Sequence, residues 1–429
     1  ELGKWMIMGE LGLDGSVRDI PGVLPFAELA AREGFSGCIF PEGSAREAVE
    51  VDGIAVYGVG KLDDVVEVLC GGPGAERFLA ARSDGDSAPE RDTSPYPDFA
   101  DIIGQEGAKR GAEIACSGSH NLIFIGPPGA GKSSIAKAMA GILPPMTKEE
   151  ALITSKIYSI AGKGALRSGL IRQRPFRAPH YSASLTAIIG GGGADGIVPG
   201  EISLAQGGIL FADEFLQMPK SVSEALRGPL EDRCVTISRL KQKVTYPASF
   251  MLVAASNPCP CGYWGEGDRC TCSEGRRQAY LDRLSGPLMD RIDLQVWTRP
   301  VSTSQIFSSP RAEPSSAVAR RVADARRIQQ MRFASEGISS NAEMSRAQIE
   351  KFCPLDEACR ATMESLMSKQ DYSMRAYFRI IKVARTIADI EEGALARAEG
   401  RPAKLDSPLR PAHLIEAAGF RFLDKVSRI

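Results

Sequence analysis

Apolar runs and stretches of helical periodicity alternate over most of the chain, and this alternation predicts its domains. At the start, strand-like apolar runs occupy residues 5–8, 37–40 and 54–59, and helical patterns occupy residues 27–33 and 62–69. Residues 1–70 therefore predict a small α/β unit. Residues 71–97 are rich in glycine, proline, serine and charge, which is typical of a linker.

A second α/β domain is predicted over residues 98–300. Buried strands are expected at residues 122–125, 208–212 and 250–255, because each is a short apolar run that ends at polar residues. Residues 219–233 predict a helix, and residues 233–248 predict a hairpin with a basic tip. Beyond residue 300 helical patterns dominate, at 317–332, 345–366, 373–399 and 410–426, so residues 301–429 predict a helical lid.

The composition narrows the class of protein. The 429 residues are 43% hydrophobic and 24% charged, as in ordinary globular proteins, and the net charge is −1. A nucleic acid would therefore have to be bound by a local basic surface. There is no secretory signal and no apolar run of the about 18–20 residues that span a bilayer, so we expect a cytoplasmic protein without membrane association. The first residue is Glu rather than Met, which suggests a fragment or a processed chain.

Residues 121–134, NLIFIGPPGAGKSS, carry the most specific chemistry. An apolar strand, a glycine-rich turn and the start of a helix enclose the spacing G-x-x-x-x-G-K-[ST]. In a P-loop of this kind backbone N–H groups surround phosphate oxygens, the lysine reaches the β- and γ-phosphates, and the hydroxyl holds Mg²⁺. The flanking strand and helix argue against a chance match. We therefore predict ATP and Mg²⁺ as cofactors, bound by Gly126, Pro127, Pro128, Gly129, Ala130, Gly131, Lys132, Ser133 and Ser134.

Polar residues at the ends of the next two buried strands extend this site. Asp213 and Glu214 follow the run ILFA, and downstream of a P-loop this pattern indicates a Walker B motif. One acid, Asp213, would join Ser133 at Mg²⁺, and Glu214 would polarise the attacking water. Asn257 ends the third strand and could orient that water, although a turn residue before Pro258 would look the same.

Four cysteines cluster in the segment CPCGYWGEGDRCTC, namely Cys259, Cys261, Cys270 and Cys272. Two Cys-x-Cys pairs joined by a turn-rich loop can present four thiolates to a structural Zn²⁺. The spacing within each pair is tighter than the usual Cys-x₂-Cys. Unligated thiols or a redox-sensitive pair therefore remain the alternatives.

Two arginines admit both a structural and a catalytic interpretation. Arg291 lies next to acids at the exit of a helix, where ordinary ion pairs or an arginine finger for a neighbouring subunit would give the same pattern. Arg375 begins a helix that also carries Arg379, Lys382 and Arg385. That run is either a solvated basic face or a place from which Arg375 reaches the γ-phosphate.

Taken together, these segments resemble the AAA+ ATPases of the magnesium-chelatase class, specifically the ComM (YifB) family. The resemblance covers nearly the whole chain and rests on GELGLDGSVRDIPGVLP, IGPPGAGKS, RPFRAPH, PGEISLAQGGILFADE, YPASFMLVAASNPCPCGY, RLSGPLMDRIDL and SMRAYFRIIKVARTIAD. It implies an AAA+ P-loop core with a C-terminal helical lid. It also implies an ATP-driven hexameric ring that acts on single-stranded or branched DNA and promotes branch migration during natural transformation.

By position, the resemblance also implies roles for single residues. Asn257 falls at sensor 1, Arg291 at the arginine finger and Arg375 at sensor 2. Residues 170–205 would be the helix-2 insert and residues 233–248 the pre-sensor hairpin, both directed toward the ring pore. On that hairpin Arg239, Lys241 and Lys243 are then the predicted contacts to DNA phosphates.

The chain departs from the family pattern in two places. Residues 1–70 resemble only the carboxy-terminal part of a Lon-protease-like domain, so we expect a partial domain. Residues 23–26 lack the lysine that Lon proteases use there, so no protease activity is expected. Ala212 stands in the Walker B strand where a larger apolar residue is usual.

Three other functions compete with a DNA motor. A magnesium-chelatase-like subunit would drive metal insertion or protein remodelling, and the Lon-like segment and the cysteine pairs argue against it. A scaffold with a vestigial P-loop is disfavoured by the intact Lys132, Asp213, Glu214 and Asn257. A Lon-type protease is disfavoured by the missing lysine.

Overall fold

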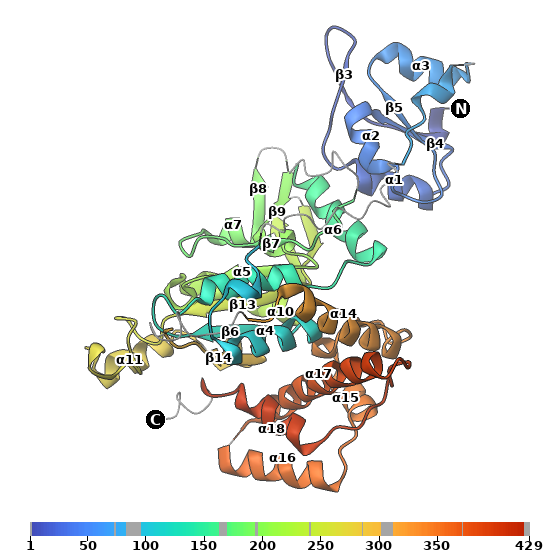
Figure 1. Cartoon of the computed structure of the whole chain (residues 1–429). Coiled ribbons are helices and arrows are strands. Elements are labelled where there is room, and N and C mark those ends of the chain that lie inside the picture. Colours follow the sequence, from blue (N-terminus) through green and yellow to red (C-terminus); the bar gives the residue numbers. More distant parts are fainter. Residues whose placement is uncertain are drawn as a thin grey trace.

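The computed structural model describes residues 2–72, 74–82, 96–162, 170–193, 196–239, 242–284, 286–301, 312–370 and 372–423. Figure 1 shows an N-terminal unit at the top right, a mixed α/β core in the middle and a group of helices at the bottom. The N-terminal unit and the core are the two α/β parts that the alternation of apolar runs predicts. In the described ranges, no helix has the length and apolar character that crossing a membrane would require.

The N-terminal unit is built on a parallel sheet with the strand order β1-β4-β5. Its strands are β1 (Trp5–Ile7), β4 (Gly37–Pro41) and β5 (Val56–Val59), and its helices are α1 (Val23–Arg32), α2 (Glu42–Ala48) and α3 (Leu62–Cys70). A short hairpin joins β2 (Glu10–Leu11) to β3 (Val17–Arg18). The segment without lysine, residues 23–26, forms the first turn of α1.

Part of the segment expected as a linker packs on this unit. A 3-10 turn, η2 (Ala75–Phe78), precedes Ala80, whose N–H donates to the carbonyl of Val56 at 2.8 Å. Arg82 donates from Nε to the carbonyl of Val49 at 3.0 Å. Residues 83–95 lie outside the described ranges.

Helix α6 (Lys148–Ile160) of the core holds the N-terminal unit in place. The N–H of Gly22 donates to the carbonyl of Ser159 at 3.1 Å, and the Ser159 hydroxyl donates to Glu47 at 2.6 Å. Lys156 forms an ion pair with Glu28 at 2.8 Å. The two units are therefore joined by polar contacts along one face of α6.

The core contains a five-stranded parallel sheet with the order β14-β6-β13-β10-β7. Its strands are β6 (Leu122–Ile125), β7 (Phe176–Arg177), β10 (Ile209–Ala212), β13 (Met251–Ser256) and β14 (Leu294–Trp297). Alternate side chains enter two hydrophobic clusters, with Leu122 and Phe124 on one face and Ile123 and Ile125 on the other. Burial on both faces explains why these strands are continuous apolar runs in the sequence.

Helices and hairpins cover the two faces of the sheet. One face packs against α4 (Glu106–Gly118), α5 (Lys132–Ile142) and the C-terminal helices. The other face packs against α8 (Glu201–Leu204), α9 (Lys220–Ala225) and the hairpin of β11 (Cys234–Arg239) and β12 (Gln242–Pro247). The helix expected over residues 219–233 is instead divided at Leu226 into α9 and α10 (Arg227–Asp232), because Pro229 has no N–H to continue the hydrogen-bond ladder.

The predicted helix-2 insert contains a second hairpin beside the first. Helix α7 (Leu185–Ile189) leads into β8 (Gly190–Gly193), which pairs with β9 (Gly196–Pro199) and rises above the core in Figure 1. The Tyr246 hydroxyl on β12 donates to the carbonyl of Ile197 on β9 at 2.6 Å. The two hairpins are therefore in direct contact.

The C-terminal region is helical, as expected, but one predicted helix is wrong. It contains α14 (Ser315–Arg332), α15 (Arg346–Phe352), α16 (Glu357–Gln370), α17 (Met374–Ala398) and α18 (Pro411–Gly419). The single helix expected over residues 345–366 is two helices, because Pro354 lacks an N–H and restricts Cys353 to a non-helical conformation. The helix expected to run to residue 426 ends at Gly419.

A buried ion pair joins α14 to α17 inside the lid. Arg332 donates two hydrogen bonds to the carboxylate of Asp389, at 2.8 and 2.6 Å, and both side chains are almost fully buried. Arg385 and Asn341 donate to the same carboxylate.

Replacing Arg332 with Met should lower the free energy of unfolding of the lid by about 3 kcal/mol. This loss is near the lower end of the range for removing one partner of a buried ion pair, because Arg385 still compensates the charge of Asp389. Urea denaturation followed by circular dichroism measures the loss. The exposed Arg327 on the same helix is the control, since Arg327→Met should change stability by less than about 1 kcal/mol. An equal loss of stability in both variants would contradict the conclusion that the buried Arg332–Asp389 ion pair stabilises the lid.

Candidate functional site

The P-loop lies at the carboxyl edge of the sheet, between β6 and the first turn of α5. Gly129 and Gly131 have φ angles of 78° and 79°, a left-handed conformation that favours glycine. A Cβ on Gly126 would lie 2.2 Å from the hydroxyl oxygen of Thr298, so a larger residue does not fit there. The loop therefore has the backbone shape that directs N–H groups at an anion, at the positive end of a helix dipole.

Lys132 and Asn257 meet at this loop. The Lys132 ammonium donates to the carbonyls of Gly126 and Pro127 at 2.6 and 2.9 Å, and to Oδ1 of Asn257 at 3.2 Å. Burial lowers the pKa of Lys132, and the nearby charges of Asp213 and Glu214 oppose that shift. Asn257 therefore contacts the P-loop lysine and is more than a turn residue before Pro258.

The two Walker B carboxylates take different positions. The Ser133 hydroxyl donates to Oδ2 of Asp213 at 2.8 Å, which places two oxygen ligands of the kind Mg²⁺ prefers side by side. Glu214 has φ 48°, an uncommon value for a non-glycine residue, and its N–H donates to Oδ1 of Asp213 at 2.9 Å. Within the described residues the Glu214 carboxylate has no hydrogen bond or ion pair, so it is available to a water molecule.

Arg291 and Arg375 lie together at the opposite edge of the sheet. Asn121, which precedes β6, donates to the carbonyl of Arg291 at 2.9 Å, whereas the P-loop follows the other end of β6. Four strand residues separate these ends by about 13 Å. The structure therefore brings Asp213, Glu214 and Asn257 to the P-loop and keeps Arg291 and Arg375 away from it.

Ion pairs hold both arginines in a cavity of about 330 Å³. Arg291 pairs with Glu231 and donates to the carbonyl of Pro287 at 2.6 Å, and Arg375 pairs with Asp290 at 2.5 Å. Other charged side chains also line this cavity, namely Arg233, Arg379, Lys382, Asp293 and Glu343. For Arg291 the structural and the catalytic interpretation are both compatible with this arrangement, because ion-paired side chains at a surface cavity can exchange partners. The solvated basic face expected for the run from Arg375 is wrong, since Arg385 turns into the lid and is only 1% exposed.

Asp293 fixes the wall of that cavity. It pairs with Arg379 and accepts a hydrogen bond from the N–H of Asn121 at 3.0 Å. Although burial alone would raise its pKa, the charge of Arg379 and the neighbouring His120 hold the pKa of Asp293 well below its usual range. Asp293 is therefore ionised at neutral pH and keeps Arg379 beside the other two arginines.

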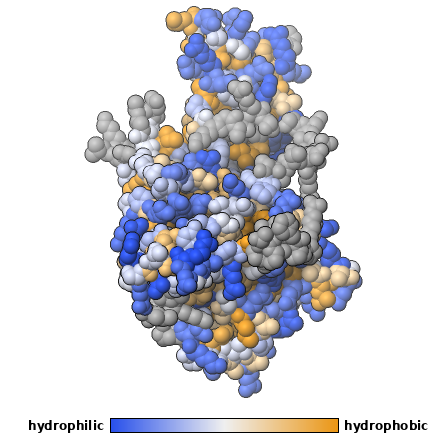
Figure 2. All heavy atoms as spheres, turned by 60° about the vertical axis from the view of Figure 1, so that its left-hand side comes forward, coloured by the Kyte–Doolittle hydropathy of each residue, from blue (hydrophilic) through white to orange (hydrophobic). Residues whose placement is uncertain are grey.

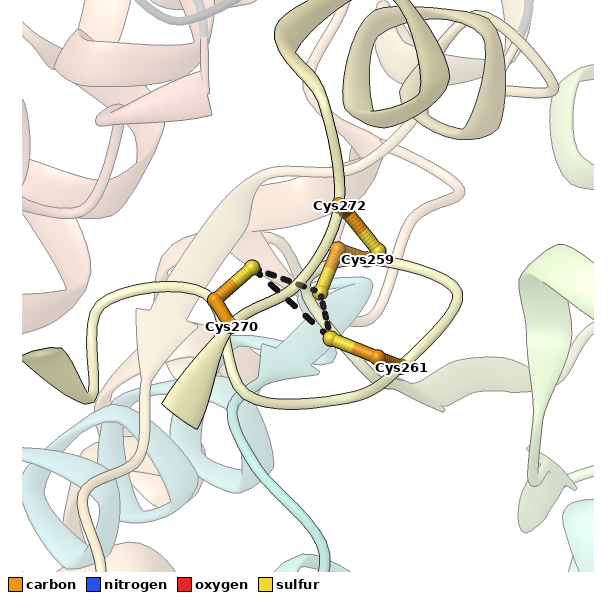
Figure 3. Close-up of side chains that lie close together, drawn as sticks. All are labelled: Cys259, Cys261, Cys270 and Cys272. Atoms are coloured by element: carbon orange, nitrogen blue, oxygen red, sulfur yellow. Dashed lines mark hydrogen bonds between the residues drawn. The ribbon is translucent and has the colours of Figure 1, made fainter. Parts of the chain in front are cut away.

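The four cysteines converge in one loop (Figure 3). The sulfur of Cys259 lies 3.4 Å from that of Cys261 and 3.8 Å from that of Cys270, and all four sulfurs lie within 4.8 Å of one another. Tetrahedral zinc with Zn–S bonds of 2.3 Å requires sulfurs about 3.8 Å apart. Backbone N–H groups, first that of Tyr263, lower the pKa of Cys261 to about 6. The cluster fits a structural zinc ion.

The cysteine loop borders the P-loop, which the sequence pattern did not indicate. A Cβ on Gly262 would lie 2.9 Å from Pro128, so the two loops are in close contact. Gln105 is a second residue that the pattern missed, since it donates to the carbonyl of Ala130 at 3.0 Å. Neither contact has a local signal, because each joins segments far apart in the chain.

We expect protein purified without chelator to contain about one zinc ion per chain, by the four-ligand stoichiometry of structural sites. Replacing Cys270 with Ser should reduce the zinc content to near zero and lower the melting temperature. Cys70→Ser, at an exposed cysteine outside the cluster, is the control and should change neither. Zinc-free protein whose four clustered thiols all titrate freely would contradict this prediction.

The predicted DNA contacts are only partly described. Lys243 lies exposed on β12 opposite Ser238, and Arg239 ends β11, whereas Lys241 lies outside the described residues. Figure 2 shows a mostly hydrophilic face with hydrophobic residues in small separate groups. The roles of these three residues in DNA binding stay predictions.

Family models match three parts of the chain. Residues 98–306 match the model for magnesium chelatase, subunit ChlI, and residues 312–399 match the model for the C-terminal region of that subunit. Residues 1–44 match a model described as subunit ChlI of Mg-chelatase. The matched regions cover the P-loop core and most of the lid.

Comparison of the sequence with individual proteins agrees with the family models. The chain is 39% identical to the uncharacterized protein YifB of Salmonella typhimurium, over 99% of this chain and 78% of that protein. It is 38% identical to the competence protein ComM of Haemophilus influenzae, over 98% of this chain and 78% of that protein. A shorter match, 40% identical over 75 residues, joins 17% of this chain to 12% of the archaeal Lon protease of Methanocaldococcus jannaschii.

Proposed function

Because the chain belongs to the YifB and ComM family of magnesium-chelatase-like AAA+ ATPases, we propose that it is an ATP-hydrolysing DNA motor. In this proposal it acts as a hexameric ring and drives helicase or branch-migration activity on single-stranded or branched DNA. The observation that carries the proposal is the separation of Arg291 and Arg375 from the P-loop of their own chain.

A ring of identical subunits would bring the two halves of the site together. In a closed ring each interface is heterologous, so one edge of a subunit meets the opposite edge of its neighbour. The P-loop lies at the carboxyl edge of the sheet, and the arginine pair lies at the amino edge. Each interface would then combine the P-loop of one subunit with Arg291 and Arg375 of the next.

The residues at the P-loop suit hydrolysis of ATP. Backbone N–H groups of the loop would bind the phosphates, and Lys132 would exchange its carbonyl partners for phosphate oxygens. Ser133 and Asp213 would hold Mg²⁺, which when bound neutralises charge on the β- and γ-phosphates. Glu214 would accept a proton from the attacking water, and Asn257 would keep Lys132 in position. Arg291 of the neighbour would stabilise the charge that develops on the transferred phosphoryl group.

The DNA substrate is supported less directly. One relative is named as a competence protein, and the β11–β12 hairpin of this chain, which contacts the β8–β9 hairpin, carries the predicted phosphate contacts. Such contacts are sequence-independent and weaken as salt concentration rises. The competing function is a chelatase-like subunit that drives metal insertion or protein remodelling, which the name of the family models favours.

ATP turnover with and without single-stranded DNA, at two salt concentrations, separates these functions. A DNA motor predicts stimulation by DNA that declines with salt. ATP turnover that DNA does not change at either salt concentration would instead favour the chelatase-like function.

Replacing Lys243 with Ala should weaken DNA binding about equally for all sequences. The slope of log affinity against log salt should fall by about one. Fluorescence anisotropy of a labelled oligonucleotide measures both quantities. Lys369→Ala, at an exposed lysine on α16, is the control. An unchanged affinity and slope in Lys243→Ala would exclude Lys243 from the DNA-binding surface.

A further inference from the structure

One guanidinium between the core and the lid is buried without an ion-pair partner among the described residues. Arg326 on α14 is only 5% exposed. Its Nε and Nη1 atoms have no hydrogen-bond partner, and in the described parts of the chain no carboxylate lies within ion-pairing distance of it. Buried charges are usually paired, so this side chain requires an explanation.

Arg326 lines a small polar cavity where the lid meets the core, which we call the core–lid cavity. Its volume is about 40 Å³. Two further arginines line it, but both already have partners. Arg174 pairs with Glu150 at 2.7 Å, and Arg233 donates to the Ser249 hydroxyl at 2.9 Å and faces Glu343 at 3.7 Å. The three arginines and two glutamates leave one positive charge in excess.

That excess charge persists at neutral pH. Burial lowers the pKa of Arg326 to about 10, the nearby charge of Arg174 acts in the same direction, and the more distant carboxylates of Glu150 and Glu343 oppose the shift only in part. The guanidinium is therefore protonated in the folded protein under physiological conditions. Because these two carboxylates leave one positive charge in excess and a buried charge is costly without a partner, a counter-ion at this place would be favoured.

We propose that the core–lid cavity binds a small inorganic oxyanion, of the size of phosphate, as the counter-ion of Arg326. A single water molecule needs about 10–15 Å³ of such space, so the cavity can hold a small ion but is far too small for a nucleotide. The Ser119 hydroxyl also lines the cavity and has no hydrogen bond to the described residues, so it can donate to an anion. A bound anion would link α14 of the lid to Ser119 at the amino edge of the core sheet.

The melting temperature of the full chain in increasing inorganic phosphate tests this proposal. A Lys132→Ala background removes the lysine contact that strengthens phosphate binding at the P-loop, and potassium gluconate, whose anion is too large for the cavity, matches the ionic strength. The expected result is a saturable rise in melting temperature with phosphate. Arg326→Met in this background should increase the half-saturating phosphate concentration at least tenfold. The control Arg327→Met, at the exposed neighbouring residue, should leave it unchanged.

An equal rise in both variants, or no rise in the background protein, would overturn the proposal. If Arg326→Met does not fold, crystals of the unaltered chain grown with selenate in place of phosphate decide the question. An anomalous selenium peak within hydrogen-bond distance of Arg326 would support the site. Water alone in the cavity would overturn it.

Discussion

Replacing Glu214 with Gln is expected to lower kcat for ATP hydrolysis by about 10²- to 10³-fold while ATP still binds. The amide keeps the size of the side chain but cannot accept the proton of the attacking water. ATP binding should persist because Lys132, Ser133 and the glycine loop are unchanged. Phosphate release measures hydrolysis, and a fluorescent nucleotide analogue measures binding.

The control for this variant is Glu149→Gln, at an exposed glutamate on α6. It makes the same chemical change outside the P-loop site and should leave kcat unchanged. Retention of more than about a tenth of the activity in Glu214→Gln would exclude Glu214 as the general base, since removal of such a group costs about 10² or more.

Replacing Arg291 with Ala is expected to have an even larger effect on hydrolysis. An arginine finger contributes about 10³–10⁵ to kcat, and none of this stabilisation is available from the remaining residues of the P-loop site. Nucleotide binding by a subunit to its own P-loop should be unaffected, because Arg291 lies at the other edge of the sheet.

Arg276→Ala, at an exposed arginine on α11 (Glu274–Leu281), is the matched control and should retain normal turnover. A variant Arg291→Ala that hydrolyses ATP at the normal rate would leave Arg291 only its structural ion pair with Glu231.

The P-loop site is the part that the sequence predicted best, because its signal is local. A glycine-rich turn with this spacing between an apolar strand and a helix usually forms a P-loop. The structure has the strand, the turn and the helix at residues 122–142. Asp213 and Asn257 could also be placed, since polar residues at the carboxyl ends of parallel strands meet at one edge of the sheet.

The distribution of charged residues could not be predicted in the same way. Amphipathic patterns treat arginine as an exposed residue, yet Arg326, Arg332 and Arg385 are buried in the lid or at its junction with the core. Their environment depends on helices that pack together from distant parts of the chain. The location of Arg291 and Arg375 opposite the P-loop likewise depends on the parallel direction of β14 and on the packing of α17 beside its amino end, which no single motif encodes.

Helix ends were misjudged where a proline interrupts an otherwise helical pattern. Pro354 divides the helix expected over residues 345–366, although the apolar periodicity on both sides is continuous enough to suggest a single element. Backbone hydrogen bonding therefore outweighs side-chain patterning at this position.

The central claim is that each active site combines residues from two subunits, and a mixing experiment tests it most directly. Lys132→Ala and Arg291→Ala proteins should each be inactive alone. In an equal mixture about a quarter of the interfaces would pair an intact P-loop with an intact Arg291, if subunits assemble randomly at heterologous interfaces. ATP turnover should therefore return to about a quarter of the unaltered rate. A mixture that assembles together but remains inactive would contradict the shared active site.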